Sequence, residues 1–110
     1  MEITDEFMKE MLAKAKNYCV VILRDGPNCE RQDARKIIWE HGRRNFALRR
    51  DGVMPIVCPI VGESDVAGVE IFCRPVDEVR RFMEDDPAIK ERVLVYQIYK
   101  CRSFQGDCLP

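Results

Sequence analysis

His41 and Asn45 are the residues whose types and spacing most directly suggest chemistry. They lie four residues apart within residues 33–51, a segment whose apolar spacing predicts one amphipathic helix. At about 100° per residue, both side chains fall on the stripe that should pack on the core. A buried imidazole and a buried amide need hydrogen-bond partners or a wet pocket. The sequence therefore predicts a polar pocket inside an otherwise apolar core.

The roles of the candidate residues stay open when each is taken alone. His41 can act as a general acid or base near neutral pH, or it can be a core histidine bonded to a backbone carbonyl. Asn45 can orient a polar ligand or satisfy His41. Arg24, at the end of a predicted strand, can bind an anionic substrate group or lie in solvent. Asp86 precedes Pro87 and has a structural reason to be present, as a helix N-cap.

The composition limits the class of protein. The chain has 110 residues, which we interpret as one domain, and a net charge of −1 from 18 basic and 19 acidic residues. This balance favours neither nucleic acid nor an anionic membrane as a partner, and the arginines within residues 43–50 are typical of a solvated helix face. No apolar run is long enough to span a bilayer, and the acidic N-terminus does not resemble a signal peptide, so we expect a cytoplasmic protein. The six cysteines are expected to be reduced, although Cys101 and Cys108 could pair, and no spacing indicates a metal or a cofactor site.

Secondary-structure signals predict a ferredoxin-like α+β domain with an additional N-terminal helix. Residues 1–17 form the helical extension and residues 100–110 an irregular tail. Pro55 and Pro59 place the second strand at an edge or a bulge, because proline cannot donate to a strand ladder. The expected strands are residues 18–23, 53–61, 66–73 and 93–99, and the expected helices are residues 5–16, 33–51 and 76–83, with one more short turn from Asp86.

Two apolar surfaces have no packing partner among the expected helices and strands. Both faces of the first and last strands are apolar, which predicts a homodimer through one sheet face that includes Val93 and Val95. Trp39 and Phe46 form a second stripe on the long helix, about 120° from His41. We expect the N-terminal helix, from the same chain or its partner, to pack on that stripe.

The order of these elements resembles the YciI-like (YCII-related) family of small dimeric α+β barrels. The resemblance covers residues 18–99 and is carried by His41, by a helix that ends at Asp51-Gly52, by a proline-containing strand and by Asp86-Pro87. It implies a dimer of face-to-face sheets and an active site in which Asp86 assists His41. Some family members resemble enzymes that remove hydrogen halide from small hydroxylated aromatics.

Two functions follow as hypotheses. The first is a cofactor-free enzyme, of lyase or isomerase type, that transfers protons on a small aromatic or anionic metabolite. His41 and Asp86 are then catalytic, and Asn45 and Arg24 bind the substrate. The second is a non-catalytic dimer that binds a small molecule or serves in assembly. A ring nitrogen of His41 within hydrogen-bond range of a carboxylate, in an open cavity, favours the enzyme.

Overall fold

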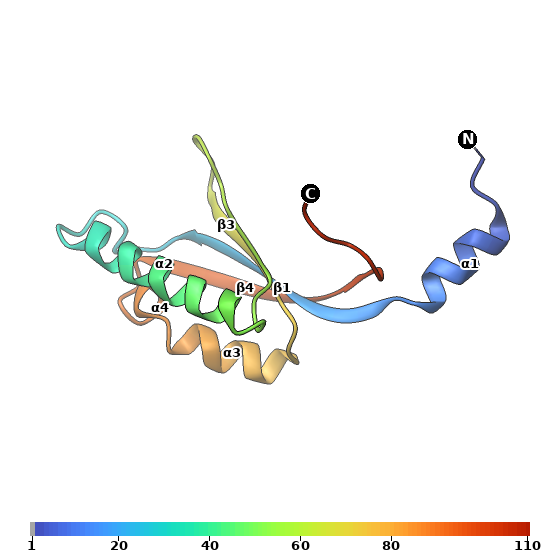
Figure 1. Cartoon of the computed structure of the whole chain (residues 1–110). Helices are drawn as coiled ribbons and strands as arrows, with labels where there is room; N and C mark the ends of the chain where they lie inside the picture. The colour runs from blue at the N-terminus through green and yellow to red at the C-terminus, as the bar shows by residue number, and fades with distance from the viewer. Residues whose placement is uncertain (1) are drawn as a thin grey trace.

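The computed structural model describes residues 2–110, which form four helices and four strands (Figure 1). In chain order these are α1 (Asp5–Ala13), β1 (Lys16–Asp25), α2 (Ala34–Arg50), β2 (Ile56–Pro59), β3 (Val66–Phe72), α3 (Val76–Glu84), α4 (Pro87–Lys90) and β4 (Leu94–Ser103). The predicted β-α-β-β-α-β order and the additional N-terminal helix are therefore confirmed.

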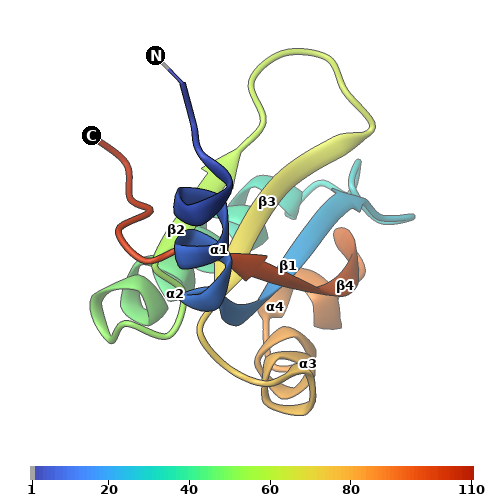
Figure 2. The same cartoon turned by 90° about the vertical axis from the view of Figure 1, so that its right-hand side faces the viewer.

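The four strands form one antiparallel sheet in the order β2-β3-β1-β4, which is the ferredoxin-like topology. Helices α2, α3 and α4 lie on one face of this sheet, as Figures 1 and 2 show. Val21 of β1, Phe72 of β3 and Met83 of α3 are at most 1% exposed between the two layers. Side chains alternate across a strand, so the register that places Val21 and Phe72 inward also places Glu70 inward.

β2 is an edge strand, as its prolines predict, but it is shorter than expected. Val53 and Met54 are buried in the turn before it, where both N–H groups donate to the Leu48 carbonyl at the end of α2. Gly52 has φ +75°, the left-handed conformation that closes a helix C-terminus. The N–H groups of Val53 and Met54 are therefore bonded to the end of α2 and are not available to extend the strand ladder.

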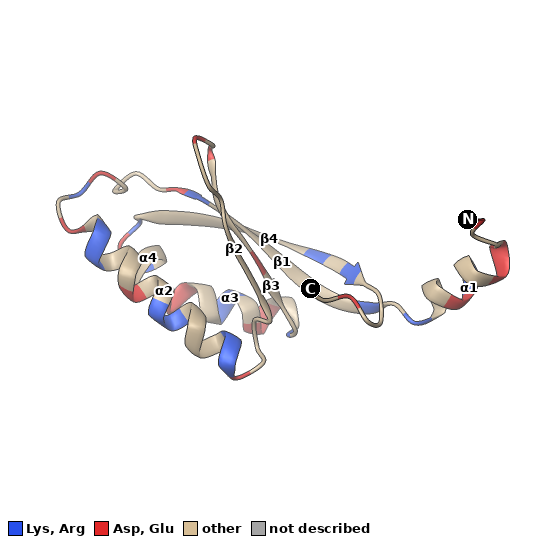
Figure 3. Ribbon diagram, turned by 45° about the horizontal axis from the view of Figure 1, so that its top comes forward, with Lys and Arg blue, Asp and Glu red and all other residues tan. Residues whose placement is uncertain are grey.

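β4 runs further than predicted and begins one residue later. Lys16 pairs with Ser103, so β1 and β4 continue as a two-stranded ribbon past the end of β3 (Figure 3). The irregular tail expected from residue 100 therefore starts only after Ser103. Val93 precedes the strand, is 2% exposed, and its N–H donates to the Ala88 carbonyl. Its predicted place in a dimer interface is wrong, because its own chain already buries it.

α1 does not pack on the body of its own domain. Thr4 caps it through a bond from the Phe7 N–H to Oγ1 (3.1 Å), and none of its residues is buried. Figures 1 and 3 show it at the far end of the β1–β4 ribbon, away from α2. Trp39 and Phe46 are 70% and 67% exposed. Packing of α1 on these residues within one chain is therefore ruled out, and packing on a partner's stripe stays a prediction.

Two further expectations concern cysteines and membranes. All six cysteines are free, including Cys101 and Cys108. Among residues 2–110, no helix has the length and apolar character needed to cross a bilayer.

Candidate active site

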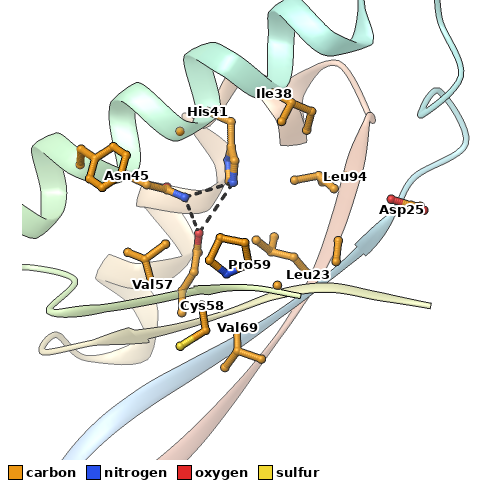
Figure 4. Close-up of a pocket in the computed structure, with 15 residues that line it drawn as sticks. Leu23, Asp25, Ile38, His41, Asn45, Val57, Cys58, Pro59, Val69 and Leu94 are labelled. Carbon is orange, nitrogen blue, oxygen red and sulfur yellow. Dashed lines mark hydrogen bonds and ion pairs between the residues drawn. The ribbon is translucent and has the colours of Figure 1, made fainter. Parts of the chain in front are cut away.

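A cavity of about 380 Å³ lies between α2 and the β2–β3–β1 part of the sheet (Figure 4). Its wall is mainly apolar, with Leu23, Val57 and Leu94 among the contributors. The polar wall residues include His41 and Asn45 from α2 and Glu70 from β3. A small apolar pocket with a few convergent polar groups is typical of sites for small molecules.

His41 is held by a buried carboxylate. Its Nδ1 lies 2.7 Å from Oδ2 of Asp86, which is 1% exposed. The other oxygen, Oδ1, accepts the Ala88 N–H at 2.9 Å and so caps the short helix α4. Because an ionised carboxylate only accepts hydrogen bonds, Nδ1 carries the proton and Nε2 is directed away from Asp86.

Asn45 connects His41 to a second carboxyl group. Its Nδ2 lies 3.1 Å from Nε2 of His41 and 3.0 Å from Oε2 of Glu70. The amide nitrogen has two hydrogens, so it can donate to both acceptors at once. Nε2 and Oε2 are themselves 3.9 Å apart, and the amide is the group that links them. The four side chains form one continuous network from Asp86 to Glu70.

Local structure explains how the network is assembled. His41 and Asn45 are four residues apart on α2 and so lie on the same helix face. Asp86 is brought beneath this face because its own side chain begins α4. Glu70 is directed toward the same helix by the alternation of β3.

Burial and charge act differently on Glu70 and His41, which both line the cavity. Burial is the largest influence on Glu70 and raises its pKa from an ordinary value of 4.5 to about 7. The nearby His41 lowers this pKa and Asp86 raises it. For His41, burial is again the largest influence and lowers the pKa. The hydrogen bond to Asp86 and the charges of Asp86 and Glu70 together outweigh burial, so the pKa lies above 6.5.

The structure brings together three of the four predicted site residues. His41 and Asn45 line the cavity, and Asp86 lies behind His41. Arg24 is not among the lining residues; its guanidinium pairs with Asp65 at 3.3 Å near the surface. A role for Arg24 in substrate binding stays a prediction.

Glu70 is the site residue that the sequence analysis missed. It occurs inside the apolar strand VAGVEIF, two residues before the buried Phe72. That spacing places a glutamate on the core-facing side, which was the available signal. A strand of this kind is recognised by its apolar residues, and a single glutamate among them does not change that prediction.

The cluster does not have the geometry of a metal site. Among residues 2–110, no group of three or more histidine, cysteine, aspartate or glutamate side chains is arranged to hold a metal ion. The arrangement suits proton transfer, since it holds an imidazole in one tautomer beside a cavity.

Comparisons with known proteins support the fold. No protein-family model matches the chain, and no curated protein matches it. Among solved structures, the chain is similar to 5-chloro-2-hydroxyhydroquinone dehydrochlorinase (TftG) from Burkholderia phenoliruptrix, in complex with 2,5-dihydroxybenzoquinone. The sequence identity is 18%, the TM-score is 0.51, and the match covers 74% of this chain and 90% of that one. At this identity the likeness shows the fold alone, and this chain has the same α+β fold as that neighbour.

Proposed function

We propose that the protein is a cofactor-free enzyme that transfers a proton on a small molecule held in the cavity beside His41. The observation that carries this proposal is the 2.7 Å contact between Nδ1 of His41 and Oδ2 of Asp86, with the same imidazole in the cavity wall. In this arrangement Nε2 exchanges the proton and Asp86 holds the ring in the required tautomer.

The cavity supports a small ligand. About 380 Å³ is within the range of small-molecule sites, and the mainly apolar wall suits a flat ring better than an extended polar chain. The solved neighbour is a dehydrochlorinase of 5-chloro-2-hydroxyhydroquinone and holds 2,5-dihydroxybenzoquinone. Hydroxylated aromatic compounds, with and without chlorine, are therefore the first compounds to test.

We also propose that the protein is a homodimer through the sheet face opposite the helices. β1 and β4 present apolar side chains there, among them the paired Val20 and Tyr99, and the exposed Gln97 lies between Val95 and Tyr99 on the same face. Val95 and Tyr99 are 37% and 50% exposed, and Tyr18, Val20 and Ile22 are only half-buried. A second copy of the same face would cover them. Light scattering at micromolar concentration should give twice 12.8 kDa, and a monomer would contradict the dimer.

The test of activity uses a panel of hydroxylated aromatic compounds with the purified protein. Halide release and hydrogen exchange from heavy water are followed by ion chromatography and NMR. We expect turnover of at least one compound, which His41→Gln abolishes and Asp86→Asn reduces at least tenfold. Asp85→Asn changes the neighbouring, exposed carboxylate and should retain the rate. Binding without turnover in the wild type would instead support the non-catalytic alternative.

A further inference from the structure

The two buried carboxyl groups of the cluster face different surroundings. Both oxygens of Asp86 are occupied, one by the Ala88 N–H and one by His41, and Asp86 does not line the cavity. Glu70 is 2% exposed and does line it. Asp86 is thus enclosed by protein, whereas Glu70 borders the space that a ligand would occupy.

Only one oxygen of Glu70 is held by the protein. Oε2 accepts from Asn45, and within residues 2–110 no group donates to Oε1. In the same part of the chain, every side-chain nitrogen or oxygen that is inaccessible to solvent has a hydrogen-bond partner. Because Oε1 has no partner, it must be accessible to solvent. It therefore belongs to the accessible wall of the cavity, where a ligand can reach it.

Asn45 decides which oxygen of Glu70 carries the proton. While the amide donates to Oε2, that oxygen must stay an acceptor. When Glu70 is neutral, its proton therefore resides on Oε1. The same amide lies between Oε2 and Nε2 of His41, and these two atoms are 3.9 Å apart, within ion-pair range but too far for a direct hydrogen bond.

From this geometry we infer that Glu70 is a second acid–base group of the site, that it exchanges a proton with the ligand through Oε1, and that Asn45 is the residue that positions this proton. The inference rests on the proposed function, because it assigns a role toward the same ligand. In the forward direction a ligand O–H bond breaks, its proton forms a new bond to Oε1, and the electron pair stays on the ligand oxygen. No oxidant, reductant or co-reactant is required.

The charges around Glu70 agree with this role. His41 and Asp86 act on it with opposite sign, and Arg44 from α2 favours its ionised form. The balance, dominated by burial, places the pKa at about 7, so both protonation states are populated near neutral pH. Because no lysine or arginine is among the lining residues, the cavity should also favour an uncharged hydroxyl group over an anion.

The first test measures Glu70 in the wild-type protein and needs no variant. The side-chain carboxyl-carbon NMR signal of Glu70 should titrate near pH 7 rather than near 4.5. Asn45→Ala removes the donor to Oε2 and should shift the midpoint upward, because a bond to the ionised form is lost. An ordinary midpoint in the wild-type protein would overturn the inference, whatever the activity.

The second test uses para-nitrophenol, whose phenolate form absorbs visible light and whose neutral form does not. We expect the wild-type protein to bind the neutral form, so that visible absorbance falls on binding at neutral pH. Glu70→Gln should raise the affinity for phenolate relative to phenol about tenfold, because it removes a negative charge from the wall. Glu40→Gln makes the same change on an exposed side chain of α2 and should leave the preference as in wild type.

The outcomes separate the two proposals. Equal phenolate binding by the wild-type protein and Glu70→Gln would overturn the role of Glu70 while leaving a ligand site in place. No binding of the probe by the wild-type protein would contradict the proposed small-molecule site, and the NMR titration would still decide whether Glu70 exchanges its proton near neutral pH.

Discussion

The polar cluster around His41 and the apolar surfaces of α1 and α2 differ in how far one chain satisfies them. Within residues 2–110, every buried polar side-chain atom has a hydrogen-bond partner. The apolar side chains of α1, and Trp39 and Phe46 on α2, lie largely in solvent. The polar cluster is complete within one chain. The apolar surfaces, including the sheet face opposite the helices, are left uncovered by the same chain. This difference supports the two proposals made above, that one chain supplies the chemistry and that a second copy covers the apolar surfaces.

The largest expected effect is a loss of stability when the polar cluster around His41 is broken. Asp86→Ala removes the N-cap of α4 and leaves Nδ1 of His41 unpaired in a buried position. We expect a loss of about 3 kcal/mol in the free energy of unfolding, measured with urea. Asp85→Ala, at the adjacent exposed position, should cost well under 1 kcal/mol. A small loss for Asp86→Ala would show that the cluster is not the stabilising centre that its bonds suggest.

A second variant tests the apolar sheet face opposite the helices. Lysine in place of Val95 would put a charge into the proposed dimer interface, where it could not easily be solvated. We expect Val95→Lys to weaken the dimer at least a hundredfold, seen as a mass near 12.8 kDa by light scattering at concentrations where wild type is dimeric. Asp85→Lys also adds a lysine, on the helix side of the domain, and should leave the dimer intact. A dimer that tolerates Val95→Lys would have to use another face.

The pH dependence of stability is a subtler property of the cluster. The pKa of Glu70 is about 7 in the folded protein and 4.5 ordinarily, so the folded state binds this proton more tightly. The free energy of unfolding should therefore fall as pH rises from about 4.5 to about 7. The raised pKa of His41 acts in the same direction, with its contribution lost as pH rises above 6.5.

Glu70→Gln isolates the glutamate contribution to that pH dependence. The variant should lose the decline between about 4.5 and 7 and keep the part due to His41. Urea unfolding at several pH values measures both curves. If the wild-type and Glu70→Gln curves run parallel over this range, Glu70 has an ordinary pKa in the folded protein.

The smallest expected effect concerns α1. The first turn of α1 is acidic, the last turn of α2 is basic, and both helices expose apolar side chains, so α1 of one chain can complement α2 of another. Trp39 is the single tryptophan and reports on this contact. In the proposed dimer, deletion of residues 2–14 should shift its emission to the red by a few nanometres. An unchanged spectrum would show that the partner's α1 does not cover this stripe.

Much of this protein could be predicted from its amino-acid order. The helical spacing of His41 and Asn45 on a core-facing stripe, the edge strand with Pro59 and the N-cap at Asp86 are local features, and each is present. Periodicity and capping act over a few residues, so the sequence alone determined the order of the helices and strands and the face on which these residues lie.

Other features depended on contacts between distant residues. The meeting of Asp86 with His41, 45 residues away, and the link from Asn45 to Glu70 arise only when α4 and β3 pack against α2. The same holds for Arg24, which looked suited to a substrate but faces Asp65, and for α1, which its own chain leaves without cover. The sequence could place each of these groups on a face. Only the tertiary structure decided which faces meet, because that choice depends on how the layers pack together.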